Sequence, residues 1–141
     1  MKRAGFAVWN GSFKDGSGTI STGSGALSGA PYSVNSRFDD RPGTNPEELI
    51  GAAHAGCFSM AFSLVLNEAN LTPDRIDTEA DVTLMKVPDG YSISAVHLVM
   101  KAKIPGISEA AFRELADKAK TLCPVSKVLN AKISLDASLV N

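Results

Sequence analysis

The chain has 141 residues, of which 44% are hydrophobic and 21% are charged, and its formal net charge at pH 7 is −1. This length and composition predict a single soluble, globular domain over residues 1–141, which buries a core without disulfide staples. The charge balance excludes a basic surface for nucleic acid phosphates and a polybasic patch for anionic lipid, so neither nucleic acid nor membrane is expected as a partner.

The N-terminus carries Lys2 and Arg3, but the polar residues 10–12 interrupt the apolar run that a signal peptide would need. The most apolar stretch, residues 52–66, is shorter than a membrane span. We therefore expect a cytoplasmic protein. In that reducing compartment two cysteines are poor candidates for a permanent disulfide, and any pairing between them would belong to a redox cycle.

Short strands joined by turns are expected in the first third of the chain. Residues 6–9 form the clearest strand, Asp15-Gly16 is a strong turn, and residues 18–22 can return as the second strand of a hairpin. Residues 21–33 are rich in turn formers and hold no helix signal. A low-complexity linker is the competing interpretation there.

A long helix is predicted from Pro46 to about residue 69. Asn45 can cap it, Pro46 suits the first helical position, and Glu48 can complete a capping box. The segment is apolar nearly all round, which is typical of a buried central helix. Its first half is crowded with small residues that would let another backbone approach, namely Gly51, Ala52, Ala53, Ala55 and Gly56.

The second half of the chain predicts two long strands, 80–87 and 91–104, and a helix that Ser108 caps. Phe112, Leu115, Ala119 and Leu122 would share one face of this helix. A short helix over 125–130 and an alternating strand over 131–139 complete the chain. Strands and helices do not alternate regularly, which favours an α+β fold on an antiparallel sheet.

The two cysteines are the first candidates for chemistry. Cys57 lies about three turns into the long helix, where it is either a small buried hydrophobe or a reactive thiol. Cys123 precedes Pro124 at an N-cap position, where it is either an inert cap residue or a stabilised thiolate. A peroxidase needs one thiolate to attack the O–O bond and a second thiol to condense with the sulfenic acid. The absence of a Cys-x-x-Cys motif excludes a thioredoxin-like site.

A thiolate nucleophile also needs a nearby cation, and Arg37 is the candidate because it lies in a segment that could be a semi-buried strand or loop. A solvated surface arginine is the alternative. Glu47 is a helix-start charge that could also hold Arg37 by a bidentate pair. His54 and His97 are interpreted as ordinary helix and strand residues rather than metal ligands.

Two segments, residues 43–61 and 119–126, resemble the signatures of the OsmC/Ohr family, and the similarity extends over essentially the whole chain. The residues around Arg37 and over 46–54 are more similar to the osmotically inducible protein C branch of the family than to its organic hydroperoxide resistance branch. The resemblance implies antiparallel sheets packed around long central helices in an intertwined homodimer. It implies a peroxidase that reduces organic hydroperoxides and hydrogen peroxide, without metal, haem or flavin.

The resemblance also implies roles for four residues. Cys57 would be the peroxidatic cysteine, Cys123 the resolving cysteine, and Arg37 with Glu47 the polar part of the site. The reductant would be a dithiol such as a lipoyl group. Glu47 and Cys57 are separated by ten residues, roughly 15 Å along one helix, so we expect Glu47 of one subunit to serve Cys57 of the other.

Two other functions compete with a peroxidase. One is a non-catalytic, dimeric ligand-binding protein with the same fold and inert cysteines. The other is a hydrolase with a Cys-His pair, because His54 lies three residues before Cys57 on the predicted helix. The chain has no recognisable oxyanion-hole motif, which disfavours the hydrolase.

Overall fold

The computed structural model describes residues 1–39 and 41–140, and the chain divides into two compact units, Met1–Leu49 and Ile50–Asn141. The boundary falls in the first turn of the long helix α2 (Pro46–Glu68). The single domain expected over residues 1–141 stays a prediction, and each unit is described by itself.

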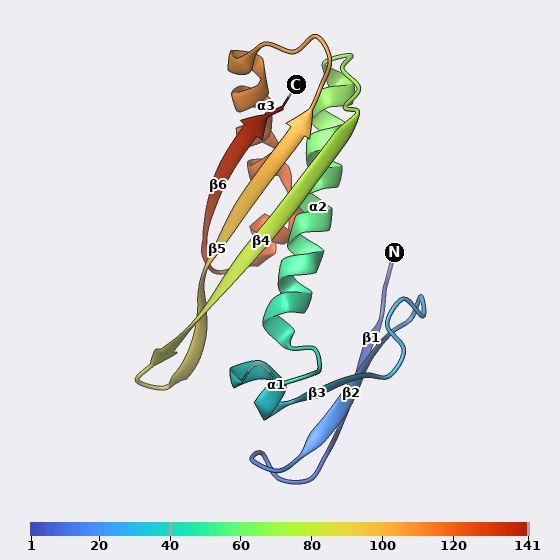
Figure 1. Cartoon of the computed structure of the whole chain (residues 1–141), viewed down its shortest axis with the longest axis vertical. Helices are drawn as coiled ribbons and strands as arrows, with labels where there is room; N and C mark the ends of the chain where they lie inside the picture. The colour runs from blue at the N-terminus through green and yellow to red at the C-terminus, as the bar shows by residue number, and fades with distance from the viewer. Residues whose placement is uncertain (40, 141) are drawn as a thin grey trace. The chain divides into compact units, whose positions relative to one another are not determined.

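The first unit contains a three-stranded antiparallel sheet in the order β1-β2-β3 (Figure 1), formed by β1 (Gly5–Asn10), β2 (Ser17–Thr22) and β3 (Ala30–Ser33). The predicted hairpin is confirmed. The turn-rich segment after it returns as a strand, which favours strands over a low-complexity linker. Gly18 lies where β2 passes beneath the Tyr32 ring, and an added Cβ would collide with that ring and with the Val8 carbonyl.

A short helix, α1 (Val34–Phe38), follows β3 directly. The strand or loop expected around Arg37 is therefore wrong. A capping box explains the difference: the Ser33 hydroxyl accepts from the Ser36 N–H at 3.1 Å, and the Ser36 hydroxyl accepts from the Ser33 N–H at 2.9 Å. The second serine of this box replaces the more usual Glu or Gln, which hid the helix start.

The predicted start of α2 is confirmed, because the Asn45 side chain accepts a 2.8 Å hydrogen bond from the Glu48 N–H. The Glu48 carboxylate accepts from the Thr44 hydroxyl at 2.5 Å, rather than completing the capping box as expected. The helix ends at Glu68, one residue from the predicted end.

The second unit holds a sheet in the order β4-β5-β6, with helices α2 and α3 on one face (Figure 1). The elements after α2 are β4 (Arg75–Val87), β5 (Gly90–Lys103), α3 (Glu109–Leu122), α4 (Pro124–Val128) and β6 (Lys132–Leu139). The α+β class is confirmed. The sheet is not wholly antiparallel: β4 pairs antiparallel with β5, whereas β6 runs parallel to β5. The parallel pairing is possible because α3 and α4 carry the chain back along the sheet before β6 begins.

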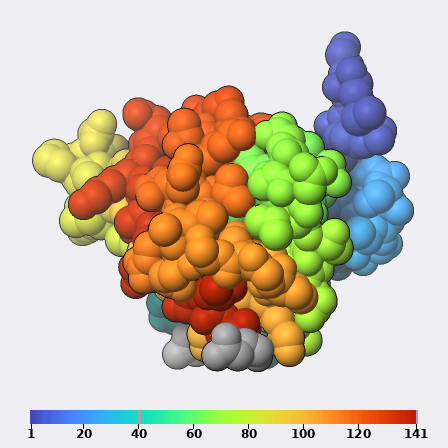
Figure 2. Space-filling view, turned by 90° about the horizontal axis from the view of Figure 1, so that it is seen from above, coloured from blue at the N-terminus to red at the C-terminus, as the bar shows by residue number. Residues whose placement is uncertain are grey.

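The core of the second unit lies between its sheet and its helices. Phe62 of α2 stacks against Phe58 at 6.3 Å and meets the edge of Phe112 of α3 at 5.8 Å between ring centroids. The predicted inner face of α3 needs one change, because Ala116 is buried whereas Leu122 is 40% exposed. At the end of α2, Glu68 pairs with Lys118 of α3 at 2.9 Å. The green and orange segments of the second unit are adjacent on the face that Figure 2 shows.

The sequence predicted a helix that is buried nearly all round, but α2 is buried on one face only. One face carries core residues, whereas Met60 is 70% exposed and Leu64 is 56% exposed. Ala53 and Gly56 are also exposed and share this second face. We call these four residues the small-apolar face of α2.

By length and composition, α2 is long and apolar enough to cross a membrane. The apolar stretch considered from the sequence, residues 52–66, is too short for a membrane span and so did not predict this. Its other face nevertheless packs into the core of the second unit through Phe58, Phe62 and Val65. The core helix of a soluble protein meets the same criterion, so α2 gives only weak support for a membrane span.

Candidate active site

The two cysteines are brought together in the second unit. Cys57 lies on α2, and Cys123 lies where α3 ends and α4 begins, 66 positions later in the chain. Both thiols are free, and they hydrogen-bond to each other. Cys123 is fully buried, whereas Cys57 is partly exposed. The arrangement therefore has one accessible thiol and one enclosed thiol in direct contact.

The Cys57–Cys123 pair behaves as one coupled acid rather than as two separate thiols. Burial raises the pKa of Cys123, but donors from Ser126, Cys57 and Val125 outweigh it and leave this pKa below its ordinary value. Burial and the neighbouring Cys123 raise the pKa of Cys57, although the Val125 N–H acts in the opposite direction. The first proton lost by the pair therefore leaves its negative charge mainly on Cys123.

A buried histidine stands behind this pair. His54 is fully buried, and its Nε2 lies 2.7 Å from the Ser126 hydroxyl oxygen. The same hydroxyl is a hydrogen-bond partner of Cys123. His54 lies one turn before Cys57 on α2, but its bond is with Ser126, and no hydrogen-bond partner is found for Nδ1 among the described residues. The Cys-His dyad that a hydrolase would need is therefore not formed.

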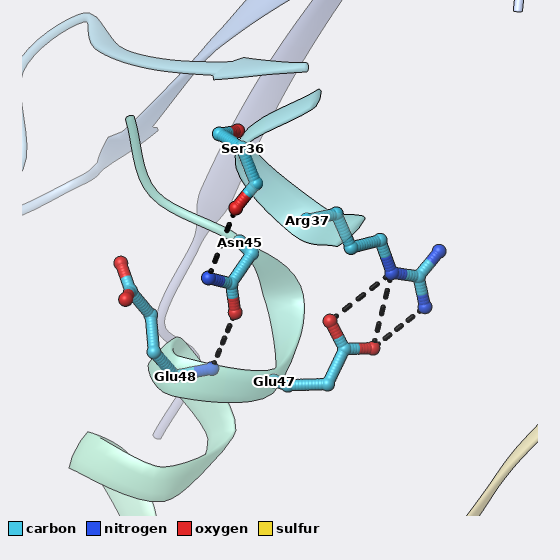
Figure 3. A network of polar contacts seen from close by, with 5 residues as sticks. All are labelled: Ser36, Arg37, Asn45, Glu47 and Glu48. Atoms are coloured by element: carbon cyan, nitrogen blue, oxygen red, sulfur yellow. Dashed lines mark hydrogen bonds and ion pairs between the residues drawn. The ribbon is translucent and has the colours of Figure 1, made fainter. Parts of the chain in front are cut away.

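Arg37 and Glu47 form the bidentate pair that the sequence allowed (Figure 3). Arg37 Nε lies 3.2 and 3.0 Å from the two carboxylate oxygens, and Nη2 lies 2.6 Å from Oε1. Ser36 and Asn45 fix the backbone on which the pair stands: the Ser36 hydroxyl donates to the Thr44 carbonyl, and the Asn45 amide donates to the Ser36 carbonyl. The Arg37 side chain is 31% exposed and that of Glu47 is 12% exposed, so the guanidinium is held at a partly open position.

An aromatic cavity of about 210 Å³ lies beside Arg37 in the first unit. Four aromatic residues line it, namely Trp9, Phe13, Tyr32 and Phe38. The Trp9 and Tyr32 rings lie 5.3 Å apart, and the Arg37 guanidinium lies 5.3 Å from the centroid of the Phe38 ring. The cavity therefore combines an apolar wall with one cation.

The structure thus joins Cys57 with Cys123 in one unit and Arg37 with Glu47 in the other. Sequence reasoning did not single out Ser126, although its position three residues after Cys123 at a helix start was a usable signal. The aromatic lining was also missed, because its residues come from separate strands and turns. Within residues 1–39 and 41–140, no group of three or more His, Cys, Asp or Glu side chains is arranged to hold a metal ion.

The chain is similar to known proteins over most of its length. The family model described as OsmC-like protein matches residues 38–138. The chain is 53% identical over 139 residues to "Peroxiredoxin OsmC" of Escherichia coli (strain K12), covering 99% of this chain and 97% of that protein. It is 32% identical over 123 residues to "Organic hydroperoxide resistance protein OhrB" of Bacillus subtilis (strain 168), covering 86% of this chain and 88% of that protein.

Solved structures share the fold. The crystal structure of the organic hydroperoxide resistance protein OhrB of Bacillus subtilis superposes with a TM-score of 0.70 at 26% identity, covering 95% of this chain and 97% of that one. An OsmC-like protein from Mycoplasma pneumoniae superposes with a TM-score of 0.77 at 20% identity, covering 100% of this chain and 99% of that one, which shows a common fold.

Proposed function

Because the chain belongs to the family of OsmC-like proteins, we propose that it is a thiol-dependent peroxidase that reduces organic hydroperoxides, and also hydrogen peroxide, in defence against oxidative and osmotic stress. The observation that carries the proposal is the direct hydrogen bond between Cys57 and Cys123. Two thiols in contact, one accessible and one enclosed, meet the two needs of the cycle, a nucleophile and a partner for its sulfenic acid.

Cys57 is assigned as the peroxidatic residue because it is the more accessible thiol of the pair. Its thiolate attacks the terminal oxygen of the hydroperoxide, an S–O bond forms, the O–O bond breaks, and the alkoxide takes up a proton to leave as an alcohol. Cys123 then attacks the sulfenic sulfur, an S–S bond forms, and hydroxide leaves and becomes water. An external dithiol, such as a lipoyl group, returns both cysteines to thiols by exchange.

Arg37 is assigned to the polar part of the same site. In the absence of another charge the pair places its negative charge mainly on Cys123, so a cation near Cys57 is needed to move the charge onto the attacking sulfur. A guanidinium held by the Glu47 carboxylate is suited to this task and to orienting the peroxide. The aromatic cavity beside Arg37 would receive the apolar group of an organic hydroperoxide.

The unit of function is proposed to be a homodimer with shared sites. The small-apolar face of α2 leaves Met60 and Leu64 exposed. Among the described residues, no atom beyond the neighbouring backbone of α2 lies within 4 Å of the position that a Gly56 Cβ would occupy. A second copy of α2 is the occupant that we assign to this face, because small residues permit close helix contact. Arg37 and Glu47 would then be delivered together by one chain to Cys57 of the other.

Mixing two inactive variants tests the shared site. A Glu47→Gln chain and a Cys57→Ser chain, unfolded and refolded together, should regain peroxidase activity, because the heterodimer contains one site with both native residues. If each chain supplied its own Glu47 and Cys57, both sites of the heterodimer would carry a defect and activity would stay absent.

The test of the proposed activity itself is the peroxidase rate of Cys57→Ser and Cys123→Ser with an alkyl hydroperoxide and dihydrolipoamide. Both should lose turnover, and full activity in Cys57→Ser would end the proposal. A non-catalytic binding protein would show no dithiol-dependent turnover in any form, including the parent. Cytoplasmic location belongs to the same proposal, since the cycle needs a reducing compartment to regenerate the thiols.

A further inference from the structure

His54 is a buried polar residue of the second unit that the proposed cycle does not use. It is fully buried on α2, and its Nε2 lies 2.7 Å from Ser126 Oγ. Ser126 in turn hydrogen-bonds to Cys123 through its side chain. A continuous line of contacts therefore runs from His54 through Ser126 and Cys123 to Cys57. A histidine kept in such a place costs desolvation, which calls for a physical reason.

The contacts decide between the two neutral forms of the His54 ring. Burial lowers the pKa of His54 below its ordinary value of 6.5, which favours the neutral ring at pH 7. With the proton on Nδ1, a buried N–H would find no partner among residues 1–39 and 41–140, and the Ser126 hydroxyl proton would point at Nε2. With the proton on Nε2, the ring donates to Ser126 Oγ, and the Ser126 proton is free to point at Cys123. The second form satisfies more hydrogen bonds and leaves only a bare lone pair on Nδ1.

We propose that His54 is a positioning residue for the resolving thiol: its Nε2–H donates to Ser126 Oγ and thereby holds the Ser126 hydroxyl proton on Cys123 Sγ. This inference rests on the proposed peroxidase cycle, in which Cys123 resolves the sulfenic acid of Cys57. His54 touches no reacting atom and neither takes nor gives a proton during the cycle. It fixes which way a hydroxyl points.

The oriented hydroxyl acts on the second step of the cycle. Cys123 attacks the sulfenic sulfur as a thiolate, and a hydrogen bond from Ser126 increases the fraction of Cys123 in that form. Without His54, the Ser126 hydroxyl can rotate away, and disulfide formation slows. The Cys57 sulfenic acid then persists and meets a second hydroperoxide, which oxidises it to sulfinic acid while a second alcohol leaves. The buried histidine therefore protects Cys57 from over-oxidation.

The first test is the pKa of Cys123 in a Cys57→Ser protein, followed by the ultraviolet absorbance of the thiolate. Adding Ser126→Ala or His54→Leu should raise this pKa by roughly one to two units. Ser126→Ala removes the hydroxyl that donates to the Cys123 thiolate, and His54→Leu lets that hydroxyl rotate away from it. Adding His54→Gln should leave it nearly unchanged, because the glutamine amide still offers a donor, and Ser126→Thr retains the hydroxyl. A Phe62→Leu control perturbs the same core without touching the line of contacts and should not move the pKa.

Equal pKa values in the His54→Leu, His54→Gln and parent proteins would overturn the proposal. If His54→Leu does not fold, Ser126→Ala against Ser126→Thr still decides whether the hydroxyl serves Cys123. This measurement does not depend on peroxidase activity, so it can succeed or fail separately from the proposed function.

The second test separates the two chemical steps in the otherwise native protein. With one equivalent of alkyl hydroperoxide, His54→Leu should form sulfenic acid at the parent rate but close the disulfide about threefold more slowly. A one-unit rise in the Cys123 pKa lowers the thiolate fraction about tenfold, and the greater nucleophilicity of the more basic thiolate offsets about threefold of that loss. Mass spectrometry under excess peroxide should show more Cys57 sulfinic acid in His54→Leu than in His54→Gln. Equal slowing of both steps would indicate a merely structural role and would refute the inference.

Discussion

Replacing Arg37 with lysine tests whether the shape of the guanidinium matters or only its charge. Three contacts between 2.6 and 3.2 Å lock the guanidinium of Arg37 against the Glu47 carboxylate. Lysine keeps the positive charge but replaces a planar fork with a single mobile ammonium. If Arg37 orients the peroxide and favours charge on Cys57, the ammonium will be displaced by about an ångström or more, which typically costs about 100-fold in rate.

The assay is kcat/KM for an alkyl hydroperoxide with dihydrolipoamide as reductant. The loss should fall on the oxidation of Cys57 rather than on reduction of the disulfide, so single-turnover oxidation should slow by the same factor. Glu47→Gln keeps the size of the side chain but removes its charge. It should cause a loss in the same direction, because the guanidinium then has no anion to hold it.

The chain provides a matched control in Arg75 and Asp77, which form the same kind of fork with contacts of 2.6 to 2.9 Å. The two side chains are 75% and 51% exposed. Arg75→Lys should leave peroxidase activity unchanged and should change the free energy of unfolding little, because solvent screens an exposed pair. Activity of Arg37→Lys within about twofold of the parent would refute the reasoning, because proximity effects would then be absent.

Three further predictions concern the second unit. Cys123→Ser should react once with hydroperoxide and stop, with a Cys57 sulfenic acid that a dimedone probe traps; the same amount of trapped product in the parent at steady state would contradict the resolving role. Burial lowers the pKa of His54 from its ordinary value of 6.5, so the folded state favours the neutral ring and the stability this provides is lost as pH falls below about 6.5. Urea titrations should therefore show that acidification lowers the free energy of unfolding less in His54→Gln than in the parent protein. Parallel pH curves for the two proteins would argue against a contribution of His54 to this pH dependence. Gly51→Ala should destabilise the fold, because its Cβ would lie 2.8 Å from the Ala80 carbonyl oxygen. The Cβ of Gly56→Ala would meet no described atom within 4 Å beyond the neighbouring backbone of α2, so this change should not lower the stability of the isolated chain.

Elements with strong local signals could be predicted from the sequence. The Asn45-Pro46 start placed α2 to the residue, and the alternation of the last strand placed its inner face on the core. The short helix α1 was missed because its cap uses two serines. The direction of β6 could not be read from its own pattern. A strand shows the same alternation whether it pairs parallel or antiparallel, and only the path of the preceding helices decides.

The site was predicted in part. The opposite charges of Arg37 and Glu47 allowed a bidentate pair as one of two interpretations, and the structure supplied the fork geometry. The contact between Cys57 and Cys123 could not be derived locally, since it depends on α3 returning along α2. For the same reason, the buried His54 was interpreted as an ordinary helix residue. Its partner, Ser126, lies 72 positions away, and only the packed core brings the two together.

Loss of free thiols, measured after the reduced protein receives one equivalent of an organic hydroperoxide per chain, distinguishes a two-cysteine peroxidase from a protein with inert cysteines. We expect rapid loss of two thiols per chain, the appearance of one disulfide between Cys57 and Cys123, and full recovery of both thiols with dihydrolipoamide. Slow loss of thiols, or a reaction confined to one thiol in the native chain, would contradict the proposed cycle.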